Sequence, residues 1–193
     1  QRFENVEQLY DYGQRIGGGV IAPFQVRSEI VALLQRVQIL APKVVLEIGT
    51  ANGGTLFLFS RVADPAAHLI SVDLPGGEFG EGYPVWKLTL YRSFALPGQT
   101  IDLIRGDSHA PQTLDHVRAC VGGKTVDFLF IDGDHTYEGV KKDYEMYSPL
   151  VRPGGMIAFH DIAHHSGGGC EVDRLWNELR VRPLLVVAGA MVA

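Results

Sequence analysis

A short apolar segment that leads into a glycine-rich turn constrains this chain more than any other feature. Residues 44–48 are short and rich in β-branched side chains, as expected of a strand buried on both faces of a sheet. Turn glycines follow the segment, and apolar residues then recur at helical spacing: Gly49, Gly53 and Gly54 in the turn, and Leu56, Phe59 and Val62 in the helix. Such a strand–turn–helix lets the backbone approach a ligand closely, so we expect the turn to bind a cofactor.

Glu47 is the unusual residue of this segment, because a carboxylate in a buried strand is costly without a partner. Dinucleotide-binding folds use Gly-x-Gly-x-x-Gly, whereas Ala51 occupies the second glycine position here. A negative charge at Glu47 does not favour a diphosphate, and it suits a cationic or zwitterionic ligand better. An NAD(P)-linked oxidoreductase is therefore the weaker interpretation, and a plain tight turn with Glu47 in an ion pair is the non-functional alternative.

Composition excludes several function classes. The chain has 193 residues, of which 46% are hydrophobic and 20% charged, which is typical of one globular domain with a substantial core. Its net charge of −5 argues against a nucleic-acid partner, and no stretch approaches the ~20 apolar residues of a membrane span. We expect a cytoplasmic protein in which Cys120 and Cys170, which lack metal-site spacing, are reduced thiols.

Strands and helices alternate along the chain. After the strand at 44–48, further strands are expected at 68–73, within 100–108, within 126–135 and at 156–159, with helical spacing between them. The order predicts an α/β fold with a doubly wound, mostly parallel sheet and a ligand site along its carboxyl edge. Residues 1–24 are interpreted as an N-terminal helix or arm, and residues 25–193 as a single domain.

Several local predictions refine this outline. Ser28 is expected to cap the helix that precedes the first strand, and Asp107 or Ser108 is expected either to cap the helix that begins near Pro111 or to contact a cofactor. One helix is expected to carry Val140, Tyr144, Tyr147 and Val151 on one face, and the Pro-Gly-Gly of residues 153–155 to form the turn after it. The segment 75–84, with four glycines, is expected to be a loop that acts either as a lid or as a plain surface connection.

Polar side chains stand at the end of each later strand. Asp73 follows the glycine turn by about twenty residues, the position from which an acid accepts hydrogen bonds from a ribose diol. This role is shared by NAD enzymes and methyltransferases, so Asp73 indicates a nucleoside and not a reaction. Asp132 and His135 follow the fourth strand, and His160 and Asp161 follow the fifth, where a purely structural role is hard to assign.

The polar residues at the strand ends, taken together, resemble those of a known family. The spacing from Glu47 through Asp73, Asp107 and Asp132 to the Pro-Gly-Gly turn is similar to class I S-adenosylmethionine (SAM) methyltransferases over roughly residues 25–180. The segments 130–135 and 159–161 narrow the resemblance to small O-methyltransferases, a group that includes macrolide-sugar O-methyltransferase and cephalosporin-hydroxylase-like proteins. The resemblance implies a Rossmann-like enzyme that moves a methyl group from SAM to a hydroxyl of a small molecule.

The resemblance also assigns cofactor contacts. The turn that contains Gly49, Gly53 and Gly54 is expected to lie along the methionine part of SAM, after the acidic Glu47. Asp107 or Ser108 is expected to meet the adenine amino group, and Asp132 lies at the cofactor as well.

A divalent ion is implied in the same way, held by Asp132 and by an acidic pair after the fifth strand. Asp161 matches one member of that pair, whereas His160 occupies the position of the other acid. The two aspartates suit Mg²⁺, and a histidine ligand would shift the preference toward Mn²⁺, Fe²⁺ or Zn²⁺. Catechol-type enzymes add an asparagine where this chain has Ile162, so that version of the site does not apply.

Methyl transfer to a hydroxyl needs a group that takes the proton. His135 is the first choice for this general base, and His160 is the second if it is not a metal ligand. Each histidine could instead be a hydrogen-bonded residue at a strand end. A SAM- or nucleoside-binding subunit without catalysis is the alternative function, in which Asp132, Asp161 and His135 would have no catalytic effect.

The sequence of the C-terminal part, residues 164–193, gives less specific predictions. Residues 164–170 are flexible by composition and are expected to shape the acceptor pocket. An amphipathic helix then carries Val172, Leu175, Trp176 and Leu179. The apolar run 183–193 fits a sixth strand, and an apolar edge there would favour a homodimer.

Overall fold

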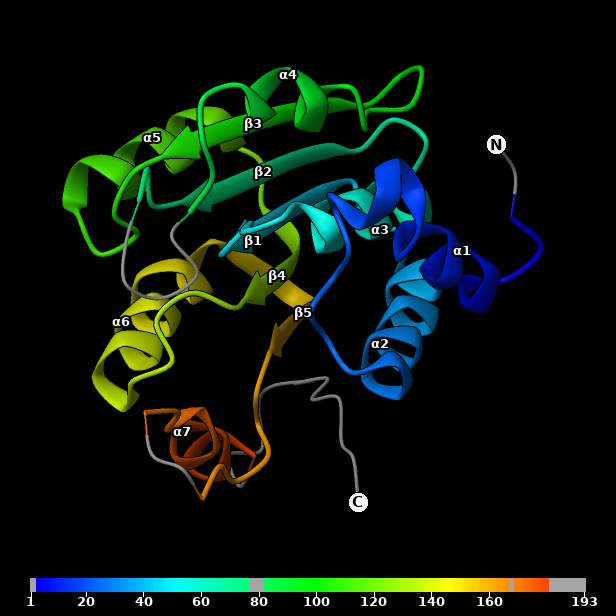
Figure 1. Ribbon diagram of the computed structural model, residues 1–193. Coiled ribbons are helices and arrows are strands. Elements are labelled where there is room, and N and C mark those ends of the chain that lie inside the picture. Colours follow the sequence, from blue (N-terminus) through cyan, green and yellow to red (C-terminus); the bar gives the residue numbers. More distant parts are fainter. Residues whose placement is uncertain (1–2, 77–81, 167–168, 181–193) are drawn as a thin grey trace.

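The computed structural model describes residues 3–76, 82–166 and 169–180. Five strands form one parallel sheet in the order β3-β2-β1-β4-β5, as Figure 1 shows. Their bounds are Val44–Ile48 for β1, His68–Asp73 for β2, Thr100–Arg105 for β3, Val126–Ile131 for β4 and Val151–Phe159 for β5. The chain builds outward from β1 to β3 on one side and then returns to place β4 and β5 on the other. The order therefore reverses between β1 and β4, where open α/β sheets bind ligands.

Helices cover both faces of the sheet, which confirms the doubly wound α/β fold. One apolar core contains residues of α1 (Val6–Gly13), α2 (Arg27–Leu40), α3 (Gly54–Val62) and α4 (Lys87–Arg92). The other contains residues of α5 (Pro111–Val121), α6 (Tyr137–Tyr147) and α7 (Val172–Leu179). In Figure 1, α1, α2 and α3 lie to the right of the sheet, and α5 and α6 lie to the left.

Strand β1 supplies both cores because successive side chains of a strand point to opposite faces. All five of its residues are buried. Val45 belongs to the core beneath α2 and α3, whereas Val44, Leu46 and Ile48 belong to the core beneath α5 and α6. The alternation places Glu47 on the same face as Val45, toward α3.

The predicted end of the helix after β4 is wrong. α6 ends at Tyr147, a 3₁₀ turn (η2) follows over Ser148–Leu150, and Val151 already pairs with Val126 in the sheet. Pro149 explains the early end, because proline cannot donate the hydrogen bond that would continue a helix. The expected Pro-Gly-Gly turn instead lies inside β5, at an edge strand whose register shifts opposite Val126 and Phe128.

The predicted helix caps are also wrong. α2 begins at Arg27 with Val26 as its N-cap, so Ser28 lies within the first turn. α5 has Ala110 as its N-cap and Pro111 in its first turn, while Asp107 accepts a hydrogen bond from the backbone N–H of His109. The expected proline position is confirmed, but the capping side chain is absent from that end of α5.

The N-terminal helix and the last helix are where the pattern placed them. α1 is followed by a 3₁₀ turn (η1, Ile16–Gly19), and Val6, Leu9 and Tyr10 are buried against α2 and α3. Val172, Leu175 and Leu179 are buried on α7. The expected sixth strand at 183–193 and part of the loop at 75–84 lie outside the described residues. Across the part of the chain that is described, the structure contains no helix whose length and apolar character would suffice to cross a membrane.

Candidate active site

A cavity of about 430 Å³ lies at the carboxyl edge of the sheet. Residues that follow all five strands line it, together with residues 22–25, which precede α2 and which we call the strap. The cavity brings together most of the site residues predicted from sequence: Gly49, Gly54, Asp73, Asp107, Ser108, Asp132, His135, His160 and Asp161. Glu47 and Gly53 are not among the lining residues.

Gly49 lets the turn after β1 pass directly against the exit of β4. Its φ is +92°, and a Cβ at this position would lie 1.9 Å from the carbonyl oxygen of Asp132. Neither this backbone conformation nor this separation accommodates a side chain. The glycine is therefore required by the contact between two neighbouring strand ends, which also line the cavity.

Glu47 supports the turn from behind. Its carboxyl group is fully buried and accepts hydrogen bonds from Thr55 Oγ1 at 2.5 Å and Ser71 Oγ at 2.7 Å. Burial raises the pKa of Glu47 to about 8, against the opposing effect of these two hydroxyl groups. The Glu47 carboxyl group thus links β1, β2 and the start of α3, and the two hydroxyl donors take the place of the ion pair considered from sequence.

Asp73 holds the other side of the turn. Its Oδ2 accepts hydrogen bonds from the backbone N–H groups of Thr50 at 3.1 Å and Ala51 at 2.7 Å, and its Oδ1 accepts one from Leu74 at 2.7 Å. Burial raises the pKa of Asp73, although these backbone donors act in the opposite direction. The carboxylate thus lies at the cavity with its orientation fixed by the turn.

The strap reaches the same cluster and was not found from sequence. Gln25 is buried, and its Nε2 donates a hydrogen bond of 2.7 Å to Asp132 Oδ2. Its Oε1 has no hydrogen-bond partner among the described residues, although it is buried. Gln25 lies 107 positions from Asp132, so no local pattern could have indicated this contact.

The strap is seated on the first residue of α3, which gives a testable expectation. A Cβ at Gly54 would lie 2.5 Å from the Pro23 nitrogen and 2.6 Å from the Ile21 carbonyl oxygen. We expect Gly54→Ala to displace the strap, to break the Gln25–Asp132 hydrogen bond and to lower the free energy of unfolding by about 1–3 kcal/mol. Urea unfolding and amide hydrogen exchange of the strap would measure both effects.

Gly13→Ala is the matched control, because it also adds one methyl group to a helix. Gly13 is the last residue of α1, and a Cβ there would meet the Leu58 side chain at an ordinary 3.4 Å. We expect Gly13→Ala to change the free energy of unfolding by less than about 0.5 kcal/mol. Equal effects of the two substitutions would contradict the close seating of the strap on α3.

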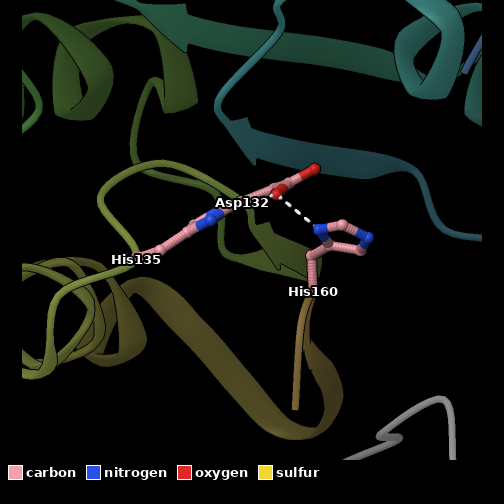
Figure 2. Close-up of side chains that lie close together, drawn as sticks. All are labelled: Asp132, His135 and His160. Carbon is pink, nitrogen blue, oxygen red and sulfur yellow. Dashed lines mark hydrogen bonds and ion pairs between the residues drawn. The ribbon is translucent and has the colours of Figure 1, made fainter. Parts of the chain in front are cut away.

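Asp132 is the centre of the ionisable cluster. Figure 2 shows His135, from the loop after β4, and His160, from the tip of β5, on two sides of this carboxylate. Asp132 Oδ1 lies 3.1 Å from His135 Nε2 and 3.0 Å from His160 Nδ1. Asp161 adds a second carboxylate, 3.4 Å from both His135 Nδ1 and His160 Nδ1, and adopts a left-handed φ of +54°.

The charges of this cluster depend on one another. Burial alone would raise the pKa of Asp132, but the two imidazoles hold it below its ordinary value. The hydrogen bond to Asp132 raises the pKa of His135. Burial would lower the pKa of His160, yet Asp132 and the nearby Asp161 raise it to about 9. At neutral pH without a bound ion, the cluster thus pairs carboxylates with a protonated His160.

The same side chains form a candidate metal site. Ligand atoms of Asp132, His135 and His160 all lie within 4.8 Å of one another. His160 was predicted as a ligand, whereas His135, predicted as the base, joins the same group. One carboxylate with two imidazoles suits Mn²⁺, Fe²⁺ or Zn²⁺ better than Mg²⁺, which prefers oxygen ligands.

A second buried pair anchors the loop after β3 and was also missed from sequence. Asp143 of α6 is fully buried, and its Oδ1 lies 3.3 Å from Nε2 of His109, which lines the cavity. The hydrogen bond to Asp143 raises the pKa of His109. Tyr147, also on α6, donates a hydrogen bond of 2.7 Å to the carbonyl oxygen of Ser108. These contacts fix the loop on which Asp107 and Ser108 stand.

Four aromatic residues between positions 83 and 94 do not contribute to the cavity wall. Tyr83, Tyr91 and Phe94 are buried in the core on the α3 side, and Trp86 is exposed, but none of the four lines the cavity. Phe24 of the strap does line it and remains 71% exposed. Sequence reasoning did not single out this residue.

Comparison with known proteins assigns the chain to a family. A family described as a methyltransferase domain matches residues 46–162, a range that contains the glycine turn, Asp132, His160 and Asp161. The chain is 28% identical over 155 residues to the uncharacterized protein y4gI of Sinorhizobium fredii, covering 77% of this chain and 16% of that protein. It is 33% identical over 116 residues to an uncharacterized protein of Acanthamoeba polyphaga mimivirus, covering 60% of this chain and 50% of that one. The chain thus spans half or less of the length of these relatives.

Solved structures show the same fold. The O-methyltransferase from Bacillus cereus in complex with SAH superposes with a TM-score of 0.61 at 16% identity, over 95% of this chain and 81% of that one. The O-methyltransferase TomG from Streptomyces achromogenes, in complex with SAM, superposes with a TM-score of 0.58 at 16% identity, over 94% of this chain and 80% of that one. These likenesses confirm the predicted sheet topology, and with the family match they lead to one conclusion. The chain belongs to the methyltransferase domain family and has the fold of the class I methyltransferases.

Proposed function

We propose that this chain is a SAM-dependent O-methyltransferase that transfers a methyl group to a hydroxyl of a small molecule. The observation that carries the proposal is one continuous cavity whose wall contains the glycine turn, Asp73, Ser108 and the Asp132 cluster. The B. cereus and TomG proteins, which share the fold, are O-methyltransferases in complex with SAH and SAM. A nucleoside and a reacting hydroxyl would thus occupy neighbouring parts of one pocket.

The cofactor would lie across the turn. Asp73 would accept hydrogen bonds from the ribose hydroxyls, because its carboxylate is already oriented at the cavity by three backbone donors. Ser108 and Asp107 would face the adenine from the loop that Tyr147 and Asp143 anchor. Gly49 and Gly54, which line the cavity, would place the backbone of the turn beside the methionine part.

A divalent ion would be held by Asp132 and His160, with Asp161 and His135 beside them. The donor set fits such an ion, and the buried Asp132 provides the negative charge that attracts it. When bound, the ion would lower the pKa of the acceptor hydroxyl and fix its position. Mn²⁺ fits the two imidazoles better than Mg²⁺ does.

His135 and His160 are not equally suited to act as the general base. A group with a pKa of about 9 carries a proton at neutral pH, so His160 cannot take one from the acceptor until it loses its own. His135 is therefore the better candidate for moving the proton when it is not engaged as a ligand. Phe24, exposed at the cavity, would contact the acceptor.

Calorimetric titration tests the cofactor assignment. We expect SAH to bind and NAD⁺ not to bind, and we expect Asp73→Ala to weaken SAH binding at least about tenfold through loss of charged hydrogen bonds. Asp115→Ala, which removes an exposed carboxylate on α5, is the control. Binding of NAD⁺ in place of SAH would instead support the oxidoreductase interpretation.

Turnover tests the reaction itself. SAH formation from SAM would be measured with a catechol, a phenolic acid and a hexose, each with Mn²⁺, with Mg²⁺ and with EDTA. SAH-binding protein that methylates no hydroxyl in any condition would favour the non-catalytic subunit. If His135→Ala left turnover unchanged at saturating acceptor, it would remove His135 as the base.

A further inference from the structure

Behind the Asp132 cluster, three different donor types converge on one point. A ring nitrogen of His135, a carboxylate oxygen of Asp161 and Cys170 Sγ all lie within 4.8 Å of one another. His135 Nδ1 and Asp161 Oδ2 are 3.4 Å apart, and Cys170 Sγ lies 3.7 Å from the Asp161 carbonyl oxygen. We propose that His135, Asp161 and Cys170 form a second metal site, selective for a thiophilic ion such as Zn²⁺.

Backbone contacts hold the three residues together without an ion. The backbone N–H of Glu171 donates a hydrogen bond of 2.8 Å to the carbonyl oxygen of His135. Glu171 Oε2 also accepts one of 3.3 Å from the Tyr137 backbone N–H. The segment that carries Cys170 is thereby fixed to the loop after β4, which places the thiol beside a residue 35 positions away in sequence. The site is built by tertiary contacts, so cysteine spacing gave no indication of it.

The donor set selects the ion. Thiolate sulfur and imidazole nitrogen are typical Zn²⁺ ligands, whereas Mg²⁺ and Ca²⁺ take oxygen. Three protein ligands leave the fourth position of a tetrahedral site to water. With Zn–N and Zn–O bonds of about 2.0–2.1 Å, two such ligands of a tetrahedron lie roughly 3.3–3.4 Å apart. The observed 3.4 Å between His135 Nδ1 and Asp161 Oδ2 matches this spacing.

The imidazole of His135 belongs to both groups of ligands. Its Nε2 lies 3.1 Å from Asp132 Oδ1, and its Nδ1 lies 3.4 Å from Asp161 Oδ2. A neutral imidazole has one nitrogen available as a ligand, because the other carries the proton. An ion at the second site therefore competes with His135 ligation at the first. Neither the donor geometry nor this competition depends on the proposed methyl transfer.

Co²⁺ is the probe, because a cobalt–thiolate bond gives a near-ultraviolet charge-transfer absorption that nitrogen and oxygen ligands do not. We expect reduced wild-type protein to develop this absorption on titration with Co²⁺ and to lose it when one equivalent of Zn²⁺ is added. Cys170→Ser should abolish the absorption and weaken Zn²⁺ binding at least about 100-fold, as loss of a direct ligand exceeds the effect of supporting residues. Absence of the absorption in wild-type protein would overturn the proposal.

Two further variants make the assignment specific. Cys120→Ser removes the other cysteine, which is partly buried on α5, and should leave the absorption unchanged. Asp132→Asn removes the centre of the first cluster and should keep the absorption, since the second site uses the opposite nitrogen of His135. His135→Gln should lose it while leaving both thiols in place, which covers the case in which Cys170→Ser does not fold. Persistence of the absorption in Cys170→Ser or in His135→Gln would contradict the proposed ligands.

Discussion

Replacing Gly49 by alanine is expected to lower the free energy of unfolding by about 2–5 kcal/mol, a large effect for one methyl group. Two costs add in this substitution. A residue with a side chain is strained at the φ of +92°, by about 1–2 kcal/mol. The added Cβ would also lie 1.9 Å from the Asp132 carbonyl oxygen, so the exits of β1 and β4 must separate, at about 1–3 kcal/mol more. Urea unfolding followed by circular dichroism measures the sum.

Gly123→Ala separates the two costs. Gly123 also has a left-handed φ, of +76°, but nothing lies within 4 Å of a Cβ built there. Only the backbone strain applies, and we expect a loss of about 1–2 kcal/mol. If the two alanine variants were equally stable, the contact between the turn and the exit of β4 would not be as close as described.

Replacing Asp132 by asparagine is expected to remove most of the pH dependence that the cluster gives to folding stability. The pKa of His160 is about 9 in the metal-free folded protein and about 6.5 in the unfolded chain. Its pairing therefore stabilises the fold fully below about pH 6.5, and this stability is lost as the pH rises through about 9. Asp132, whose pKa is lowered, contributes above its unfolded value of about 3.9 and loses that contribution as the pH falls.

The contribution of this cluster to the free energy of unfolding should accordingly be largest between about pH 4 and pH 6.5. Up to about 3 kcal/mol of that contribution should be lost by pH 9. In Asp132→Asn we expect most of that loss to disappear and the pKa of His160 to fall toward its ordinary value, with Asp161 still acting to raise it. NMR titration of the imidazole and urea unfolding across this range, both in EDTA, are the measurements. Asp102→Asn removes the exposed carboxylate beside His68 and should leave both results unchanged. Titration of wild-type His160 near 6.5 would contradict the ion pairing.

The sheet could be predicted from sequence because its signals are local. The short apolar strands and the glycine turn each lie within a few consecutive residues, and carboxyl ends of parallel strands meet at one edge. The same logic placed Asp73, Asp132 and His160 at one cavity. The predicted end of α6 was wrong because helical spacing alone extended the helix to Val151, whereas Pro149 ends it earlier.

The rest of the site depends on contacts between distant residues. Gln25 contacts Asp132, and His109 contacts Asp143. The two residues of each pair lie too far apart in sequence for a short motif to indicate the contact. Glu47 was correctly noted as anomalous, but sequence alone could not reveal that Thr55 and Ser71 satisfy its carboxyl group. Partner identity, unlike strand position, is decided by tertiary packing.

The several attachments of Asp132 limit how the pocket could be redesigned. Its backbone oxygen abuts Gly49, and its side chain holds Gln25 and both histidines. Under the proposed function, a change made there to admit a new acceptor would alter the cofactor side of the pocket at the same time. Phe24 lines the same pocket and remains exposed, so it can be varied at lower cost. Libraries aimed at new acceptors should therefore begin at the strap and keep the strand tips fixed.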